Sequence, residues 1–472
     1  MLLAVLVSQA TLGRTVECAA LAGRRLGDAR IESAALVAKG APLALWAGAP
    51  PSAAPRDFCR VRAVATPVAG SRIGIEVWLP SASQWNGKYL QAGNGGFAGG
   101  VPLGALFDAL QRGYSAAATD GGHVSADGLD ASFGMGHPER VVDFGWRAVQ
   151  RTTVAAKRLI RATLGRAPTR SYFVGCSDGG RDAMMVAQRS PAAFAGIVSG
   201  APAMYWTELM VAGALLQREL APQAASAAAC NAGSLAACGA GAFVRDPLQC
   251  HFDPAVLRCA GEENATCLTA TQASAARMVY AGVADPSTGE HLPGLEPGAE
   301  AQPGNWDFWL LAAPTNPLGD SHGTRSLPES FFRYLVRADP AFTLADLTDA
   351  DLLQAHQRWG ATLDAVDTDL GAFRRHGGRL IQYHGWSDSA IPPRFSIAYH
   401  SAVERRLGDT SAFYRLFMIP GMNHCGGGAG PWRVDWIDVL EQWVERGVAP
   451  RQLLATEPRT GQTQALRPFG GA

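Results

Sequence analysis

The sequence has 472 residues, 47% of them hydrophobic and 17% charged, so the chain can bury a large core and is too long for one simple domain. Its 41 basic residues balance its 41 acidic residues, which excludes strong net-charge attraction to nucleic acid or an anionic membrane. No apolar run reaches the roughly 18 residues of a transmembrane helix. The composition therefore favours a small, neutral or weakly charged ligand.

Nine cysteines without a Cys-x-x-Cys metal pattern favour disulfides in an oxidising compartment, and the odd count leaves at least one thiol unpaired. The first ten residues have the apolar core of an export signal but no basic residue before it. We interpret them as the truncated end of such a signal and expect a secreted or periplasmic protein. The alternative is an ordinary buried segment.

The first predicted strands alternate with glycine-rich turns. Residues 73–79 alternate as a strand, and residues 114–120 read as a buried strand. Asp120 and His123 lie at the carboxyl end of the second, where we interpret them as structural hydrogen-bonding groups. Residues 144–164 have the pattern of a helix with a basic outer face.

A further strand, within residues 85–92, runs into the glycine-rich loop 93–100. Glycine lets a backbone N–H approach a reacting carbonyl closely, so this loop is where an α/β-hydrolase would carry its second oxyanion donor. A phosphate-cradling loop is the rival interpretation. The missing Gly-Lys-Ser/Thr ending disfavours it.

The stretch 170–189 carries the strongest catalytic signal. A short aromatic and β-branched run ends in Gly-Cys-Ser-Asp-Gly and opens directly into a helical pattern, which is the strand, sharp turn and helix of a nucleophile elbow. The glycines are needed because the elbow strains the backbone at the serine and brings neighbouring chain segments close. Ser177 is therefore the candidate nucleophile. The alternative is a glycine-rich turn with an incidental serine.

Residues from about 205 to 371 interrupt the strand pattern after a predicted strand and turn at 194–202. Five cysteines fall between residues 230 and 267, within loop-like sequence, and we interpret this region as an inserted lid. Its aromatic residues are candidates for a substrate pocket, although we expect most to form the core of the lid: Trp306, Phe308, Trp309, Phe331, Phe332 and Tyr334.

Two polar residues then follow late strands in the chain order Ser, Asp, His. Asp388 comes just after the predicted strand 379–384, and His424 lies in the loop after the last strand, 413–419. These are the positions of the acid and the general base in α/β-hydrolases. The sequence therefore predicts a serine hydrolase.

A cysteine adjoins each of two candidate catalytic residues, since Cys176 precedes Ser177 and Cys425 follows His424. If the serine and the histidine are within hydrogen-bond reach, the Cα atoms of these cysteines can lie within the ~4.4–6.8 Å that a disulfide spans.

With these motifs the chain resembles the tannase and feruloyl esterase family. Gly-Cys-Ser-x-Gly-Gly-Arg stands at 175–181, His-Gly-Trp-x-Asp at 384–388 and Gly-Met-x-His-Cys at 421–425. The resemblance runs from about residue 18 to about residue 448. It implies an α/β-hydrolase fold with a lid, a triad of Ser177, Asp388 and His424, and a disulfide Cys176–Cys425.

The mechanism that the resemblance implies is acyl transfer. His424 would take the proton of Ser177, Asp388 would fix the imidazole tautomer, and water would cleave the acyl-enzyme. The N–H groups of Asp178 and of Gly95 or Gly96 would hold the oxyanion.

The resemblance also implies the disulfides Cys18–Cys59, Cys230–Cys250 and Cys259–Cys267, which would leave Cys238 unpaired. Many family members bind calcium in an Asp-rich loop of the lid. The corresponding stretch here, 231–246, keeps only Asp246, beside Arg245. We therefore expect the calcium site to be lost, with no metal or cofactor.

Relatives divide among gallate esters, hydroxycinnamate esters and the mono(2-hydroxyethyl) ester of terephthalate. Residues 327–334 and 391–393 resemble the first two branches more than the third. We therefore expect a small-molecule aromatic-acid ester, such as a feruloyl or gallate ester, with a terephthalate monoester as the alternative. A catalytically silent binding protein is the alternative of another class, which the intact triad disfavours.

The predicted architecture is an α/β-hydrolase core formed by residues 15–204 and 372–472, with the lid formed by residues 205–371.

Overall fold

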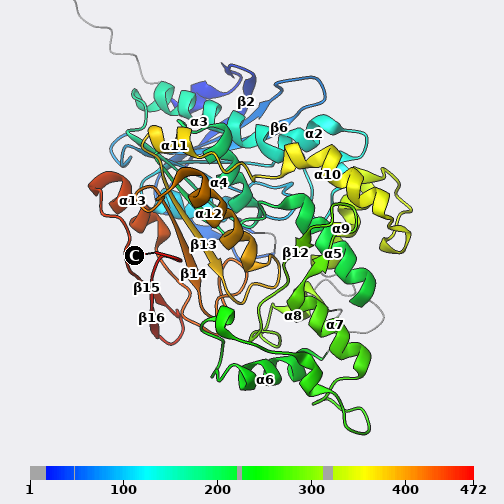
Figure 1. Cartoon of the computed structure of the whole chain (residues 1–472). Coiled ribbons are helices and arrows are strands. Elements are labelled where there is room, and N and C mark those ends of the chain that lie inside the picture. The colour runs from blue at the N-terminus through cyan, green and yellow to red at the C-terminus, as the bar shows by residue number, and fades with distance from the viewer. Residues whose placement is uncertain (1–16, 47, 221–225, 312–322, 472) are drawn as a thin grey trace, which may run out of the picture.

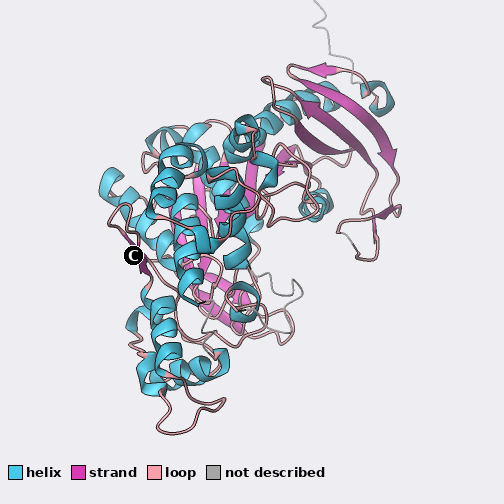
Figure 2. Ribbon diagram, turned by 90° about the vertical axis from the view of Figure 1, so that its right-hand side faces the viewer, coloured by secondary structure: helices cyan, strands magenta, loops and turns pink. Residues whose placement is uncertain are grey.

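A ten-stranded sheet runs through the molecule in the order β1-β2-β5-β6-β8-β7-β9-β10-β13-β14. The computed structural model describes residues 17–46, 48–220, 226–311 and 323–471. The N-terminal stretch that we interpret as an export signal lies outside these residues. Figure 2 shows the central strands with helices on both sides.

Six neighbouring strands are parallel, and the rest of the sheet is antiparallel. The parallel strands are β8 (Ser115–Thr119), β7 (Lys88–Ala92), β9 (Arg170–Cys176), β10 (Gly196–Gly200), β13 (Arg379–Gly385) and β14 (Tyr414–Ile419). The antiparallel strands are β1 (Arg25–Leu26), β2 (Ala29–Val37), β5 (Phe58–Ala65) and β6 (Ile73–Pro80). The α/β class expected from the sequence is confirmed.

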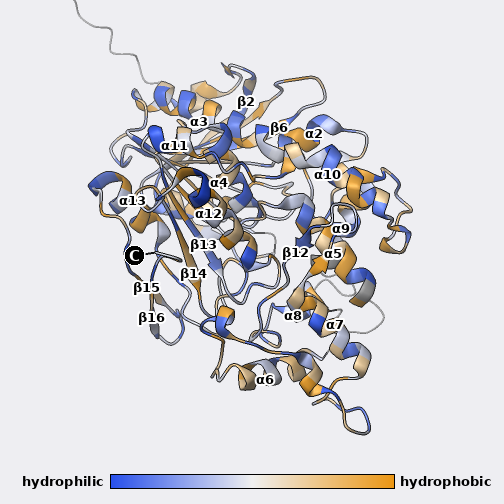
Figure 3. Cartoon of the chain, in the orientation of Figure 1, coloured by the Kyte–Doolittle hydropathy of each residue, from blue (hydrophilic) through white to orange (hydrophobic). Residues whose placement is uncertain are grey.

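Alternation along the strands divides the core between the two faces of the sheet. Ile197 and Leu380 pack into the cluster under α3 (Ala148–Leu164), α4 (Asp178–Arg189) and α12 (Pro393–Leu407). Their chain neighbours Val198 and Ile381 pack into the opposite cluster, under α1 (Leu103–Gln111) and α13 (Trp436–Arg446). Figure 3 shows hydrophobic residues on the central strands and hydrophilic residues on outer helices such as α10 and α13.

The predicted strands and helix are present with small changes at their ends. The strand expected within 85–92 begins at Lys88. The side chains of Trp85 and Asn86, which precede it, both form hydrogen bonds with the backbone of Lys88. The helix expected over 144–164 begins with a π-helical turn, Asp143–Arg147, before α3.

Between β10 and β13 the described chain adds no strand to the main sheet. Its helices are α5 (Trp206–Leu220), α6 (Ala227–Ala237), α7 (Ala270–Ala281), α8 (Trp306–Trp309), α9 (Gly323–Ser330), α10 (Asp349–Leu363) and α11 (Gly371–Arg375), and Phe331–Val336 is a π-helix. Helices α6, α7 and α8 lie at the end of the molecule opposite α3 and β2 (Figure 1).

This insertion shares a hydrophobic cluster with the rest of the chain. Phe97 and Phe144 pack in the same cluster as Phe332 and Trp359 of the insertion. The division of the chain at residues 205 and 371 stays a prediction. Small elements complete the fold: α2 (Pro138–Val142) and the two-stranded pairs β3 (Pro42–Leu43) with β4 (Ser52–Ala53), β11 (Val283–Ala284) with β12 (His291–Leu292), and β15 (Leu453–Thr456) with β16 (Thr463–Leu466).

In the part of the chain that the structure describes, no helix is both long and apolar enough to cross a membrane.

Four disulfides are present, and one of the expected pairs is wrong. Cys18–Cys59, Cys176–Cys425 and Cys259–Cys267 are formed as expected. Cys250, however, pairs with Cys238 and not with Cys230.

The reason lies in the geometry of α6. Cys230 is on its buried face, whereas Cys238 caps its C-terminus, with its Cα 5.1 Å from that of Cys250. Cys230 is therefore the free cysteine, and burial raises the pKa of its thiol to about 12. It remains a protonated core residue near neutral pH.

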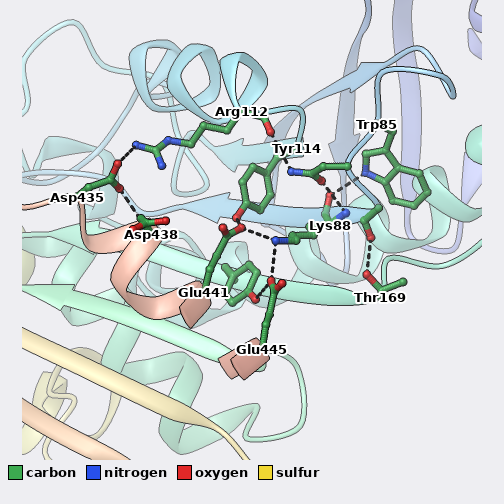
Figure 4. A network of polar contacts seen from close by, with 12 residues as sticks. Trp85, Lys88, Arg112, Tyr114, Thr169, Asp435, Asp438, Glu441 and Glu445 are labelled. Carbon is green, nitrogen blue, oxygen red and sulfur yellow. Dashed lines mark hydrogen bonds and ion pairs between the residues drawn. The ribbon is translucent and has the colours of Figure 1, made fainter. Parts of the chain in front are cut away.

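Helix α13 is fastened to the sheet by a partly buried ion cluster (Figure 4). Lys88 Nζ lies 2.7 Å from the Oε1 atoms of both Glu441 and Glu445. Tyr114 donates its hydroxyl to Glu441, and Tyr172 donates to Glu445 at 2.6 Å. Burial alone would lower the pKa of Lys88, but the hydrogen bonds with the two glutamates raise it. Because Lys88 begins β7, this cluster lies at the edge of the sheet opposite the glycine-rich loop.

Lys88→Met is expected to lower the free energy of unfolding by about 1–3 kcal/mol, because it leaves two partly buried carboxylates without their cation. Urea denaturation would measure the loss. Lys39→Met is the matched control, since Lys39 is exposed and its side chain forms no ion pair within the described residues. Equal stability of the two variants would show that the cluster contributes nothing.

Candidate active site

Ser177 stands at a sharp turn between β9 and α4, with φ 65° and ψ −125°. A non-glycine residue reaches this backbone conformation only when its surroundings impose it. A Cβ atom on Gly175 would lie 2.2 Å from the carbonyl oxygen of Gly179, so only glycine fits there. This is the strand, turn and helix of the predicted elbow.

The glycine-rich loop after β7 packs directly on this turn. The N–H of Gly179 donates to Asn94 O at 2.8 Å, and a Cβ atom on Gly93 would lie 2.6 Å from the Cα of Gly179. As a result, Gly95 and Gly96 line the same cavity as Ser177, with a volume of about 290 Å³. Within the described residues, the N–H groups of these two glycines have no hydrogen-bond partner.

His424 also lines that cavity and is paired with Asp388. Its Nδ1 lies 2.8 Å from Asp388 Oδ2, while the other carboxylate oxygen accepts the N–H groups of Ala390 at 2.8 Å and Ile391 at 3.0 Å. Burial by itself would raise the pKa of Asp388, but His424 and hydrogen bonds from both neighbouring histidines hold it far below its usual range. Asp388 is therefore an anion at neutral pH.

The second of those histidines, His384, is a site residue that the sequence analysis did not single out. It ends β13, and its Nε2 lies 3.2 Å from Asp388 Oδ2, while its Nδ1 contacts Ser396 Oγ at 2.7 Å. His384 is fully buried and helps to hold the Asp388 carboxylate in place. The sequence signal that could have identified His384 is its place in the His-Gly-Trp-x-Asp motif, four residues before Asp388.

The disulfide Cys176–Cys425 joins the elbow to the loop that carries His424. The two Cα atoms are 5.9 Å apart across a sequence separation of 249 residues. Cys425, like Ser177, has a positive φ, 63°. The bond therefore holds two strained backbone segments beside the cavity.

Behind the elbow, the buried Arg181 holds several segments together. Its guanidinium forms an ion pair with Asp178 at 2.6 Å and donates to the carbonyl oxygen of Gly145 at 2.7 Å. It also lies over the rings of Phe144 and Trp206, at 4.7 and 5.2 Å from their centroids. Since Trp206 lines the cavity, Arg181 connects the elbow helix to the cavity wall.

Of the six lid aromatics named from the sequence, two line the cavity: Phe308 and Trp309. The ring of Trp309 packs edge-on against His424, with centroids 5.3 Å apart. Trp306, Phe331 and Phe332 are buried in hydrophobic clusters. Leu209, Met210 and Leu327 add apolar wall that periodicity did not single out.

Asp120 and His123 do not line the cavity. Asp120 Oδ1 accepts the N–H groups of Gly74 at 2.9 Å and Gly122 at 2.8 Å, and burial raises its pKa to about 6. The ring of His123 stacks on Phe133, at 3.6 Å between centroids. Both residues support the local structure.

In the stretch 231–246, where the family resemblance would place a calcium loop, Asp246 caps a short 3-10 helix by accepting the N–H of Leu248 at 3.2 Å. Among the described residues, no group of three or more His, Cys, Asp or Glu side chains is arranged to hold a metal ion. The loss of the calcium site stays a prediction.

The model of the family described as tannase and feruloyl esterase matches residues 59–469. An uncharacterized esterase of Xanthomonas campestris is 37% identical, over 85% of this chain and 77% of its own length. The mono(2-hydroxyethyl) terephthalate hydrolase of Piscinibacter sakaiensis is 31% identical, over 90% and 84%.

Among solved structures, feruloyl esterase B from Aspergillus oryzae matches with a TM-score of 0.84 and 25% identity, over 94% of this chain and 93% of its own. An esterase from the same organism matches with a TM-score of 0.86 and 25% identity, over 96% and 95%. The sheet, the inserted helices and the sequence match agree, and the chain belongs to the tannase and feruloyl esterase family of carboxylic ester hydrolases.

Proposed function

We propose that this esterase hydrolyses esters of aromatic acids, such as feruloyl or gallate esters, through a triad of Ser177, His424 and Asp388. The observation that carries the proposal is the hydrogen bond between the ionised Asp388 and His424. His424 lines the same cavity as Ser177, which stands on a strained turn. An intact acid, base and nucleophile disfavour a catalytically silent binding protein.

In this mechanism Asp388 accepts the Nδ1–H of His424, which leaves Nε2 free to take the proton of Ser177 as its oxygen attacks the ester carbonyl. The imidazolium then gives that proton to the departing alcohol. Water, activated in the same way, cleaves the acyl-enzyme and restores the serine.

The oxyanion would be held by backbone N–H groups of Asp178, at the start of α4, and of Gly95 or Gly96. The N–H groups of Gly95 and Gly96, which have no partner among the described residues, and the N-terminus of α4 would stabilise negative charge on the oxygen of the reacting carbonyl. Loss of one such donor typically costs ~10²–10³ in rate.

The aromatic acid is supported by what relatives are said to act on. The Aspergillus structure is a feruloyl esterase, whereas the Piscinibacter relative hydrolyses a terephthalate monoester. A panel of methyl ferulate, methyl gallate and mono(2-hydroxyethyl) terephthalate separates these substrates. Four disulfides fit the proposed secreted or periplasmic location.

Ser177→Ala is expected to abolish hydrolysis of activated aryl esters and leave the melting temperature nearly unchanged, because it removes the nucleophile and little volume. Release of p-nitrophenol measures the rate. Residual activity above a few per cent in folded protein would refute the assignment of the nucleophile.

A Cys176→Ala, Cys425→Ala double variant is expected to lose at least tenfold in kcat when assayed well below its melting temperature. The bond closes a loop of 249 residues, for which chain entropy predicts about 5 kcal/mol of stabilisation. It also fixes the separation of the two segments that carry Ser177 and His424. A displacement of about 1 Å at such a pair can lower the reaction rate by ~10²-fold.

The matched control for this variant is Cys259→Ala, Cys267→Ala, which removes a disulfide whose cysteines adjoin neither Ser177 nor His424. It is expected to keep normal kcat. Normal kcat in the folded Cys176→Ala, Cys425→Ala variant would reduce that bond to a structural cross-link.

Millimolar calcium and EDTA are each expected to leave the melting temperature and activity unchanged, since a ligand stabilises the native state only by binding it. Differential scanning fluorimetry with either addition checks this. A rise of several degrees in the melting temperature with calcium would contradict this prediction. It would show that the protein binds calcium although Asp246 is the only carboxylate in the loop.

A further inference from the structure

A second cavity, of about 60 Å³, adjoins the active-site cavity inside the inserted region. We call it the inner chamber. Five residues line both cavities: Leu209, Met210, Trp309, Leu327 and Ala390. One of them, Trp309, is in ring contact with His424. The inner chamber therefore directly borders the active-site cavity, and these five residues lie between the two.

The lining of the inner chamber is apolar. It is completed by side chains of α5, α7 and the segments that follow them, among them Ala212, Leu216, Met278, Val279 and Leu295. Among the described residues that line it, none carries a charge, and Ser389 has the one hydroxyl group. A carboxylate or a polyhydroxylated ring would lose its water there without gaining partners.

The size of the chamber suits a short chain. A volume of about 60 Å³ corresponds to about four to six water molecules, and a methylene group fills nearly the space of one water. Water itself is a poor occupant, because it needs two to four polar partners. Met210, which lines both cavities, has a flexible side chain that adapts to what lies beside it.

We propose that the inner chamber receives a hydrocarbon group of the ester, an alkyl chain of about four to six carbons, while the ester carbonyl lies at Ser177. This rests on the proposed function and adds a substrate class to it: esters with an apolar chain on the acid or on the alcohol. Burial of each methylene group is expected to raise kcat/KM about fourfold until the chamber is full.

Two ester series test the proposal and tell the two sources of the chain apart. p-Nitrophenyl acetate, butyrate, hexanoate and octanoate lengthen the acid, whereas methyl, butyl and hexyl ferulate lengthen the alcohol. We expect kcat/KM to rise with chain length in one series and to level off near hexanoate or hexyl ferulate. A flat or falling kcat/KM in both series would overturn the proposal.

Ala212→Phe should fill the chamber, because Ala212 lines it and does not line the active-site cavity. We expect this variant to keep the wild-type rate on the shortest ester and to lose most of the gain from longer chains. Ala270→Phe, the same change at the exposed first residue of α7, is the control and should keep the gain. A full gain in folded Ala212→Phe would also overturn the proposal.

Met278→Ala enlarges the chamber and carries the test if Ala212→Phe does not fold. Its best substrate should shift toward the octanoate or the hexyl ester, and an unchanged preference would count against the chamber. Failure of the proposed function looks different. In that case even the shortest esters are not hydrolysed, or Ser177→Ala still hydrolyses them.

Discussion

The close approach of three glycine backbones is the constraint on which the candidate site depends. Gly175 and Gly93 both press against Gly179, at distances that leave no room for a Cβ atom. This contact brings the end of β9, the start of α4 and the loop after β7 together at one edge of the sheet. It therefore sets the position of Ser177 relative to the open N–H groups of Gly95 and Gly96.

A second constraint is the buried negative charge of Asp388. Burial of a carboxylate is costly unless hydrogen bonds and a positive partner favour its charged form. Here two backbone N–H groups and two histidines provide them. The supporting His384 is itself held by Ser396 of α12. The orientation of His424 thus depends on residues from β13, the following loop and α12.

The inserted region is part of the site rather than an attachment to it. Its π-helix and α10 contribute to the same hydrophobic cluster as Phe97 and Phe144, and Phe308, Trp309 and Leu327 complete the cavity wall. Arg181 reinforces the junction by donating to the carbonyl of Gly145 and stacking on Trp206. The shape available to a substrate is consequently set by packing between segments far apart in the sequence.

Local patterns in the sequence determined much of this. Glycine spacing and the strand-to-helix change at residue 177 predicted the elbow, because backbone strain and close packing permit few residue types there. The family resemblance carried by the motifs around Asp388 and His424 and by the adjoining cysteines implied the Cys176–Cys425 bond that the structure contains.

The tertiary structure decided what depends on side-chain direction. Cys230 and Cys238 are eight positions apart, and only the folded α6 shows which of them faces Cys250 and which is buried. The contact of His384 with Asp388 and the cavity walls from α5, α8 and α9 likewise arise from long-range packing. Periodicity reports which residues are apolar, but only the packed chain determines which of them border empty space.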